Sequence, residues 1–242
     1  MNAIETKQLT KRYKELTAVD GLELTVRQGE LFALLGVNGA GKTTTIKMLS
    51  CLTKPTAGDA LLLGKSVTKE PEAVREQIAV SPQETAVAPK LTVRENLELM
   101  AGIHGTDRAA VRDKISALSA RFGLDEVLNR PAGKLSGGWQ RRLSIAMALI
   151  LEPKILFLDE PTLGLDVLAR AELWEQIRAL KGEITIILTT HYMEEAESLS
   201  DRIGVMRKGH LIRVGTAAEL KAETGTETLE AAFIALAKEA TR

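Results

Sequence analysis

The sequence predicts an α/β fold in which a mainly parallel core sheet carries helices. Short, apolar runs occur at Leu31–Leu35, Ile155–Leu158 and Ile184–Leu188. Such runs are typical of parallel strands that are buried on both faces. Between the first two, from about residue 92 to 151, apolar residues recur mostly with helical spacing. The 242 residues suit one large domain or two small ones.

Further elements surround the first apolar run. Leu22, Leu24 and Val26 alternate with polar residues, which predicts one half-buried strand that ends at residues 28–29. A helix is predicted over Lys42–Leu49, directly after the first apolar strand and a glycine-rich turn. These elements place a strand, a glycine loop and a helix in succession.

Helical spacing dominates the middle of the chain. Val93, Leu97 and Met100 share one face of a predicted helix. We interpret residues 90–142, approximately, as a helical lobe inserted into the α/β core.

The last elements are a hairpin and a helix. Residues 203–206 and 210–214 flank Arg207-Lys208-Gly209, which predicts two strands joined by a turn. Apolar residues at helical spacing predict a short amphipathic helix over about 226–238, which we expect to pack on its own domain.

Composition excludes several classes of protein. Lys+Arg and Asp+Glu each number 32, so the chain has no net charge. It therefore lacks the excess of positive charge that is typical of general nucleic-acid binding. The single cysteine, Cys51, excludes an intrachain disulfide and a cysteine-cluster zinc site. No apolar run approaches the ~20 residues of a membrane span, and the N-terminus lacks the apolar core of a signal peptide. We therefore expect a cytoplasmic protein.

A phosphate-binding loop follows the first buried strand. Gly36, Gly41, Lys42 and Thr43 fit the pattern G-x4-G-K-[ST]. Its glycines let backbone N–H groups converge on phosphate oxygens, Lys42 reaches the β- and γ-phosphates, and the Thr43 hydroxyl holds Mg²⁺. The loop residues predicted to bind nucleotide are Gly36, Asn38, Gly39, Ala40, Gly41, Lys42, Thr43 and Thr44.

Two acidic residues end the second buried strand. Asp159 and Glu160 follow Ile155–Leu158. In a phosphate-loop ATPase, an aspartate here holds Mg²⁺, directly or through water. Glu160 would then face the γ-phosphate, where a carboxylate that orients or deprotonates water contributes roughly 10²–10⁴-fold to the rate.

A third motif, Leu135-Ser136-Gly137-Gly138, is typical of a helix start. Ser136 can cap the helix, and the glycines allow an anion to approach the backbone. On these residues alone, a simple loop-to-helix cap is an equally good interpretation.

Together and in this order, the motifs resemble those of the ATP-binding-cassette (ABC) ATPases, over nearly the whole chain. The resemblance implies that Gln83 contacts Mg²⁺ and the attacking water, and that His191 contacts the γ-phosphate. It also implies that Tyr13 stacks on adenine and that residues 164–166 cross a dimer interface. The implied catalytic residues are Glu160, His191 and Gln83; the implied metal-binding residues are Thr43, Gln83 and Asp159.

One position departs from the family pattern. The family has glutamine after the two glycines, whereas this chain has Trp139, with Gln140 displaced by one. The serine and both glycines remain, so we expect closure around ATP to survive. Trp139 is expected to pack either at the dimer interface or against the helical lobe.

The resemblance implies one nucleotide-binding domain over residues 1–242. Its phosphate-loop NTPase core, at about 1–90 and 143–215, would be of the ABC type, with an antiparallel β subdomain and the inserted helical subdomain. Two subunits, either two copies or this chain and a paralogous ATPase, would dimerise head to tail around two ATPs. Each ATP would lie between the phosphate loop of one subunit and Ser136, Gly137 and Gly138 of the other.

The resemblance further implies an ATPase subunit that drives transport through a separate polytopic membrane permease. The permease would dock a helix between the core and the helical lobe, near Gln83, and hold the subunit on the inner face of the cell membrane. Residues 38–45 and 228–233 are most similar to single-domain ATPases of export systems.

Two other functions stay open. A soluble, single-cassette ATPase of iron–sulfur cluster assembly would share these motifs without transport. A non-hydrolysing ATP clamp is the other, although Glu160 and His191 argue against it because a clamp needs neither.

Overall fold

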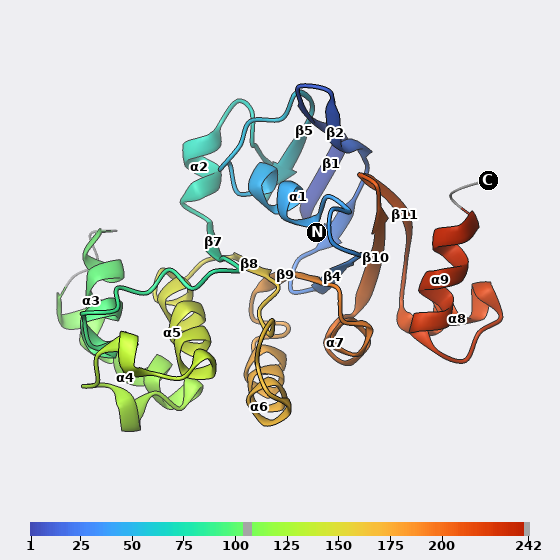
Figure 1. Ribbon diagram of the computed structural model, residues 1–242. Helices are drawn as coiled ribbons and strands as arrows, with labels where there is room; N and C mark the ends of the chain where they lie inside the picture. Colours follow the sequence, from blue (N-terminus) through green and yellow to red (C-terminus); the bar gives the residue numbers. More distant parts are fainter. Residues whose placement is uncertain (104–107, 240–242) are drawn as a thin grey trace.

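The computed structural model describes residues 1–103 and 108–239, which fold around two β-sheets (Figure 1). The strands are β1 (Asn2–Tyr13), β2 (Leu16–Leu22), β3 (Thr25–Arg27), β4 (Leu31–Leu35), β5 (Ala57–Leu62), β6 (Lys65–Ser66), β7 (Ile78–Ser81), β8 (Ile155–Asp159), β9 (Thr185–Thr190), β10 (Arg202–Arg207) and β11 (His210–Gly215). The α-helices are α1 (Lys42–Leu49), α2 (Pro71–Arg75), α3 (Val93–Ile103), α4 (Arg108–Phe122), α5 (Gly137–Leu149), α6 (Val167–Arg178), α7 (Met193–Leu199), α8 (Ala217–Thr224) and α9 (Leu229–Glu239). Two 3₁₀ turns, η1 (Asp125–Val127) and η2 (Ala132–Lys134), precede α5.

The larger sheet contains the predicted apolar strands. Its order is β11-β10-β4-β9-β8-β7, and all neighbours are parallel except β10 and β11, which form the predicted hairpin. Leu35 pairs with Thr190, and Asp159 pairs with Thr189. The carboxyl ends of β4, β8 and β9 therefore meet at one edge, from which the phosphate loop, Glu160 and His191 continue.

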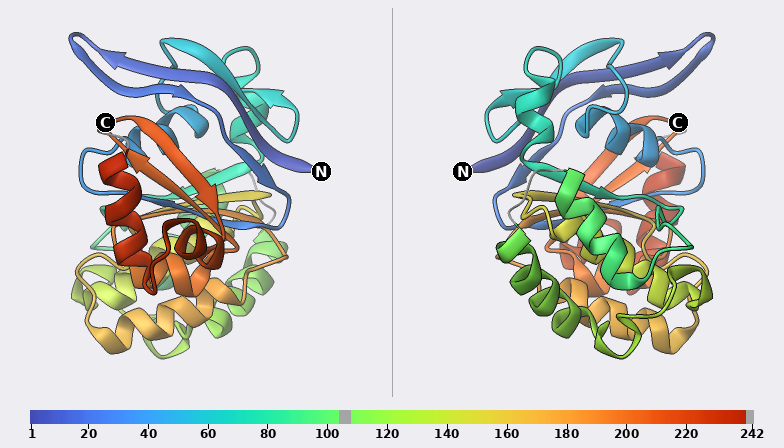
Figure 2. Two further views of the ribbon diagram at one scale, coloured as in Figure 1. Left: turned by 90° about the vertical axis from the view of Figure 1, so that its right-hand side faces the viewer. Right: turned by 90° about the vertical axis from the view of Figure 1, so that its left-hand side faces the viewer.

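Two layers of side chains cover this sheet. Leu31, Ala33 and Leu35 of β4 lie in a cluster with apolar side chains from α5, α6 and α7. Phe32 and Leu34 point the other way, into a cluster with α1 and the antiparallel sheet. The two side views show helices below the parallel sheet and the antiparallel strands above it (Figure 2). This double burial explains why the strands are apolar throughout.

The predicted helical region between β7 and β8 is confirmed. Helices α3 and α4 pack on each other and on α5, to one side of the sheet (Figure 1). Val93 and Leu97 are fully buried in this packing. Helix α5 runs across residue 142, where we expected the lobe to end, and so joins the lobe helices to β7 and β8.

The predicted single strand around residues 22–28 is wrong in one respect, because it is two strands. β2 and β3 both pair antiparallel with β1, but the pairing is interrupted between them. There the Leu24 N–H donates to the Thr6 hydroxyl at 2.7 Å instead of to a ladder carbonyl. The alternation itself is confirmed, since Leu22, Leu24 and Val26 are all buried.

The C-terminal helix packs as expected. α9 contacts α7, α8 and β11, and Leu229 and Leu236 lie in the cluster beneath the sheet. Among the described residues, no helix has both the length and the apolar character needed to cross a bilayer.

Candidate functional site

The loop between β4 and α1 has a backbone that only glycine permits at two positions. Gly41 has a φ of 106°, and a Cβ there would lie 2.6 Å from the Ala18 carbonyl oxygen. A Cβ on Gly36 would lie 2.6 Å from the Met206 carbonyl oxygen. The N-terminus of α1 has no side-chain cap. Its first-turn N–H groups are therefore available to an anion, which the helix dipole also favours.

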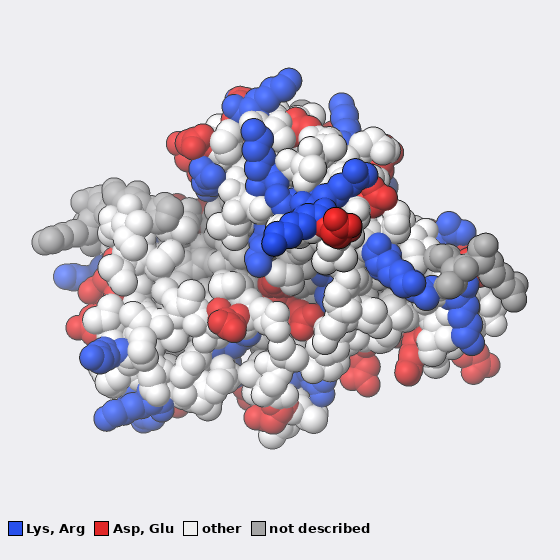
Figure 3. Space-filling view, turned by 45° about the horizontal axis from the view of Figure 1, so that its top comes forward, with Lys and Arg blue, Asp and Glu red and all other residues white. Residues whose placement is uncertain are grey.

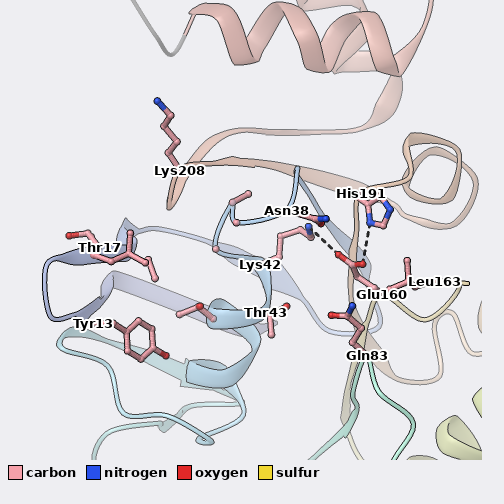
Figure 4. A pocket seen from close by; sticks show the side chains of 16 residues that line it. Tyr13, Thr17, Asn38, Lys42, Thr43, Gln83, Glu160, Leu163, His191 and Lys208 are labelled. Carbon is pink, nitrogen blue, oxygen red and sulfur yellow. Dashed lines mark hydrogen bonds and ion pairs between the residues drawn. The ribbon is translucent and has the colours of Figure 1, made fainter.

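This loop forms one wall of a pocket of about 780 Å³ (Figure 4). A cavity of this size accommodates a nucleotide. Loop residues 38–44 line it together with Tyr13, Gln83, Glu160 and His191, so the structure brings these predicted residues together. Gly36, at the start of the loop, does not line the pocket, and its carbonyl oxygen accepts a hydrogen bond from Lys42 Nζ at 2.7 Å.

Three predicted side chains make one polar chain across the pocket. Lys42 Nζ lies 3.3 Å from Glu160 Oε1, and His191 Nδ1 lies 3.1 Å from Glu160 Oε2. The dashed lines in Figure 4 mark these two contacts. Lys42 and Glu160 are both buried. A buried ion pair is expensive to desolvate, and its presence in a pocket indicates a functional role more than a stabilising one.

The backbone of Glu160 is strained. Its φ is 47°, in the left-handed region that costs a non-glycine residue roughly 1–2 kcal/mol. The Glu160 N–H donates to the carbonyl and hydroxyl oxygens of Thr189, each at 3.1 Å. These bonds hold the turn that directs the carboxylate into the pocket. Strain of this kind is concentrated at functional sites.

Hard oxygen ligands meet at the end of β8. The Thr43 hydroxyl lies 3.2 Å from Asp159 Oδ1, which also accepts a hydrogen bond from the Thr189 hydroxyl. Gln83, with its amide oxygen, lines the same pocket. Hydroxyl and carboxylate oxygens are ligands that Mg²⁺ prefers, so this donor set fits the ion.

The rim of the pocket includes residues that the sequence did not reveal. Tyr13, the aromatic residue expected to stack on adenine, is 44% exposed. The Lys11 ammonium lies 5.0 Å from the centre of its ring. The unpredicted lining residues are Leu16, Thr17, Ala18, Leu163 and Lys208. They come from β2, the turn after β8 and the β10–β11 turn, and no local motif marks them.

Of the residues that the structure describes, two lysines and one carboxylate, that of Glu160, line the pocket, although the chain as a whole is neutral. Lys42 and Lys208 both line the pocket. Lys and Arg side chains also gather over the upper and central part of the face seen in Figure 3. A local excess of cations attracts a polyphosphate.

The third motif lies outside this pocket. Ser136 and Gly137 are exposed at the start of α5 and do not line the cavity. Ser136 occupies the N-cap position, but the expected capping bond from its side chain is absent. Trp139 is half buried against the cluster that the helices of the lobe share, with its ring centre 4.9 Å from the Arg142 guanidinium.

Glu195, on α7 just after His191, is a buried carboxyl group that sequence analysis missed. Its Oε1 accepts hydrogen bonds from the Thr162 hydroxyl at 2.8 Å and from the Trp174 indole at 3.1 Å. Its Oε2 has no hydrogen-bond partner among the described residues. Burial raises the pKa of this carboxyl group above the ordinary glutamate value.

We expect Glu195→Gln to stabilise the protein more at pH 8 than at pH 5. Burial favours a protonated Glu195, whereas the unfolded chain releases this proton above the ordinary glutamate pKa. The wild type therefore loses stability as pH rises from that value toward the raised pKa, and the neutral amide does not. Melting temperatures of both proteins at both pH values measure this; each kcal/mol shifts Tm by roughly 2–4 °C.

The exposed Glu194, one residue earlier, provides the control. Glu194→Gln should leave the difference from wild type independent of pH. The same pH-independence for Glu195→Gln would contradict a raised pKa of the buried Glu195 carboxyl group.

The fold and the pocket define a phosphate-loop nucleoside triphosphatase. The model of the ABC transporter family matches residues 19–163. The daunorubicin/doxorubicin resistance ATP-binding protein DrrA of Streptomyces peucetius is 44% identical over 94% of this chain and 69% of its own length. The Nod factor export ATP-binding protein I of Burkholderia pseudomallei is 44% identical over 94% of this chain and 75% of its own length. The chain therefore belongs to the ATP-binding subunits of ABC transporters, which are ATPases coupled to transport.

Solved structures agree with this membership. A structure of an ATP-binding subunit of an ABC transporter superposes with a TM-score of 0.86 and 31% identity, over 97% of this chain and 99% of that chain. The dimeric, post-hydrolysis cassette MJ0796, bound to ADP and phosphate, superposes with a TM-score of 0.80 and 27% identity, over 88% of this chain and 98% of that chain.

Proposed function

We propose that two copies of this chain, or this chain and a paralogous subunit, close around two ATP molecules to drive export through a separate membrane permease. The convergence of Lys42, Glu160 and His191 carries this proposal. Their contacts of 3.1–3.3 Å unite a phosphate-binding cation, a carboxylate and a histidine at one point of the pocket. An ATP clamp without hydrolysis requires neither the carboxylate nor the histidine.

Each of these side chains has a role in hydrolysis. Lys42 and the N–H groups at the start of α1 bind the phosphates and stabilise the charge that develops on them. The Glu160 carboxylate orients or deprotonates the attacking water. His191, which contacts Glu160 Oε2, orients that carboxylate and contacts the γ-phosphate. Tyr13 stacks on the adenine at the open rim.

Thr43, Asp159 and Gln83 would hold Mg²⁺. When bound, the ion would neutralise part of the negative charge of the phosphates. The hydroxyl–carboxylate contact between Thr43 and Asp159 supports this role for the pair.

The exposed third motif supports a shared site. Ser136, Gly137 and Gly138 lie outside the pocket of their own chain, so a second subunit would present them to the ATP. The dimeric structure of the cassette MJ0796 supports such an arrangement. ATP would then favour the closed dimer over the open one by its differential affinity for the two.

A second, apolar groove lies between the core and the helical lobe. Its cavity is about 350 Å³ and is lined by Leu52, Pro82, Met100, Met147 and Leu151 among others. Leu52 is 68% exposed at this groove, so the groove presents apolar surface that a partner can cover. A cytoplasmic helix of the permease would fit there and would hold the subunit at the inner face of the membrane. Drug resistance and Nod factor export in the relatives' names favour export over cluster assembly.

The test is capture of the permease. Tagged Glu160→Gln protein is purified from its own cells in mild detergent with Mg-ATP. We expect mass spectrometry to identify a polytopic membrane protein in the eluate. Adding Leu52→Glu should abolish its capture, whereas Ile234→Glu, on the exposed side of α9, should not. Recovery of soluble cluster-assembly proteins alone would contradict export through a separate permease.

A further inference from the structure

Arg141 joins the third motif to the segment that carries Gln83. This arginine lies in the first turns of α5 and is only 4% exposed. Its guanidinium donates to the carbonyl oxygen of Pro82 at 2.6 Å and to that of Gln83 at 2.5 Å. One planar group thus holds two successive backbone carbonyls, a geometry that the fork of an arginine suits and a lysine cannot reproduce.

A second polar contact reinforces the same junction. One turn further along α5, the Ser144 hydroxyl lies 3.0 Å from the Ser81 hydroxyl, and both groups are buried. Buried polar groups are costly unless paired, so this geometry is well determined. α5 is therefore fixed to the end of β7 and to the two residues that follow it.

This junction lies between the two cavities of the protein described above. Pro82 lines the apolar groove, and Gln83 lines the nucleotide pocket. The helix that holds both begins at Gly137, in the third motif. Arg141 therefore connects the helix that begins in the third motif to the segment that lines both cavities.

Arg142, the next residue along α5, makes different contacts from Arg141. Arg142 forms an ion pair with Glu172 and stacks on Trp139. Burial lowers the pKa of the Arg141 guanidinium, and the negative charges of Asp159 and Glu195 oppose this effect. Arg141 is thus an interior cation whose hydrogen bonds go to backbone carbonyls.

We propose that Arg141 is a positioning residue for ATP hydrolysis, which fixes the backbone of Gln83 so that its side chain points into the pocket. The proposal rests on the role proposed above for Gln83. Without Arg141 the phosphate loop still binds ATP, but the Gln83 amide is misplaced. Small displacements of a positioned group cost up to about 10²-fold in rate.

The test combines a double-mutant cycle with hydrogen exchange. Arg141→Met, Gln83→Ala and the double variant are assayed for ATP hydrolysis, and Arg141→Lys is assayed beside them. We expect Arg141→Met to lower kcat about 10–100-fold, with the KM for ATP within about threefold of wild type. In the Gln83→Ala background it should have no further effect, because it acts through Gln83. Arg141→Lys should give an intermediate loss.

Exchange of the backbone amides of Ser81, Gln83 and Glu84, which surround Pro82, gives a readout that does not depend on activity. Arg141→Met should accelerate this exchange, because the carbonyl groups of Pro82 and Gln83 lose the hydrogen bonds that they accept and the segment opens more often. The control is Arg121→Met, which removes another arginine that donates to a backbone carbonyl, that of Ala179. It should change neither kcat nor exchange at Ser81, Gln83 and Glu84.

Three outcomes would overturn the proposal. The first is wild-type kcat in folded Arg141→Met, or in Arg141→Lys if the methionine variant does not fold. The second is a double variant in which the two losses multiply, since Arg141 would then act independently of Gln83. The third is wild-type activity of Gln83→Ala alone, which would also overturn the role proposed for Gln83. If either of the first two outcomes is found while Gln83→Ala hydrolyses ATP slowly, the role proposed for Gln83 is not contradicted.

Discussion

Glu160→Gln protein should bind ATP and form a stable dimer, while its rate of hydrolysis falls by about 10²–10⁴-fold. Glutamine has nearly the same size as glutamate, so it can still contact Lys42 and His191. Their nitrogen atoms lie 3.3 Å and 3.1 Å, respectively, from the Glu160 carboxylate oxygens. It cannot accept a proton from water. ATP then remains intact between the subunits, and the closed dimer persists.

Two measurements check this result. Steady-state phosphate release gives the loss in kcat, and light scattering with Mg-ATP gives the oligomeric state. Glu175→Gln, an exposed change on α6, is the control and should retain wild-type behaviour. A Glu160→Gln protein that stays monomeric with ATP, or that hydrolyses it at the wild-type rate, would contradict the role of Glu160.

The elements that carry the pocket were predictable because their sequence signals are local. The apolar runs of β4, β8 and β9 reflect burial on both faces, and G-x4-G-K-T requires the glycines that the loop geometry demands. Helix α8 was missed although a local signal exists. Thr216 and Glu219 form a reciprocal capping box at its start, a pattern that marks a helix N-terminus.

Other features depend on contacts between distant segments. β1 contains bulges and a left-handed Gln8, with a φ of 50°, so its polar and apolar residues do not alternate regularly. The sequence alone does not distinguish the adjacent arginines Arg141 and Arg142. Because successive side chains of an α-helix are rotated by about 100° around its axis, only Arg141 points toward the Gln83 carbonyl. Glu195 likewise looks like an ordinary helix glutamate until Trp174 and Thr162 are placed beside it.

Lys42→Ala should weaken ATP binding by about 10–100-fold. Hydrogen bonds to charged groups contribute roughly 1.5–3 kcal/mol each, and 1.4 kcal/mol corresponds to a factor of ten in affinity. Isothermal titration calorimetry with Mg-ATP measures the change. Lys47→Ala removes an exposed lysine from the same helix and should leave the affinity unchanged. Equal affinity in Lys42→Ala would contradict phosphate binding by this side chain.

The same substitution should also lower the melting temperature, because it leaves the buried Glu160 carboxylate without its cation. Loss of binding and loss of stability must therefore be separated. In the double variant Lys42→Ala/Glu160→Gln the unpaired charge is absent, so stability should recover while ATP affinity stays low. Recovery of affinity together with stability would mean that Lys42 supports the pocket through Glu160 instead of binding the phosphates.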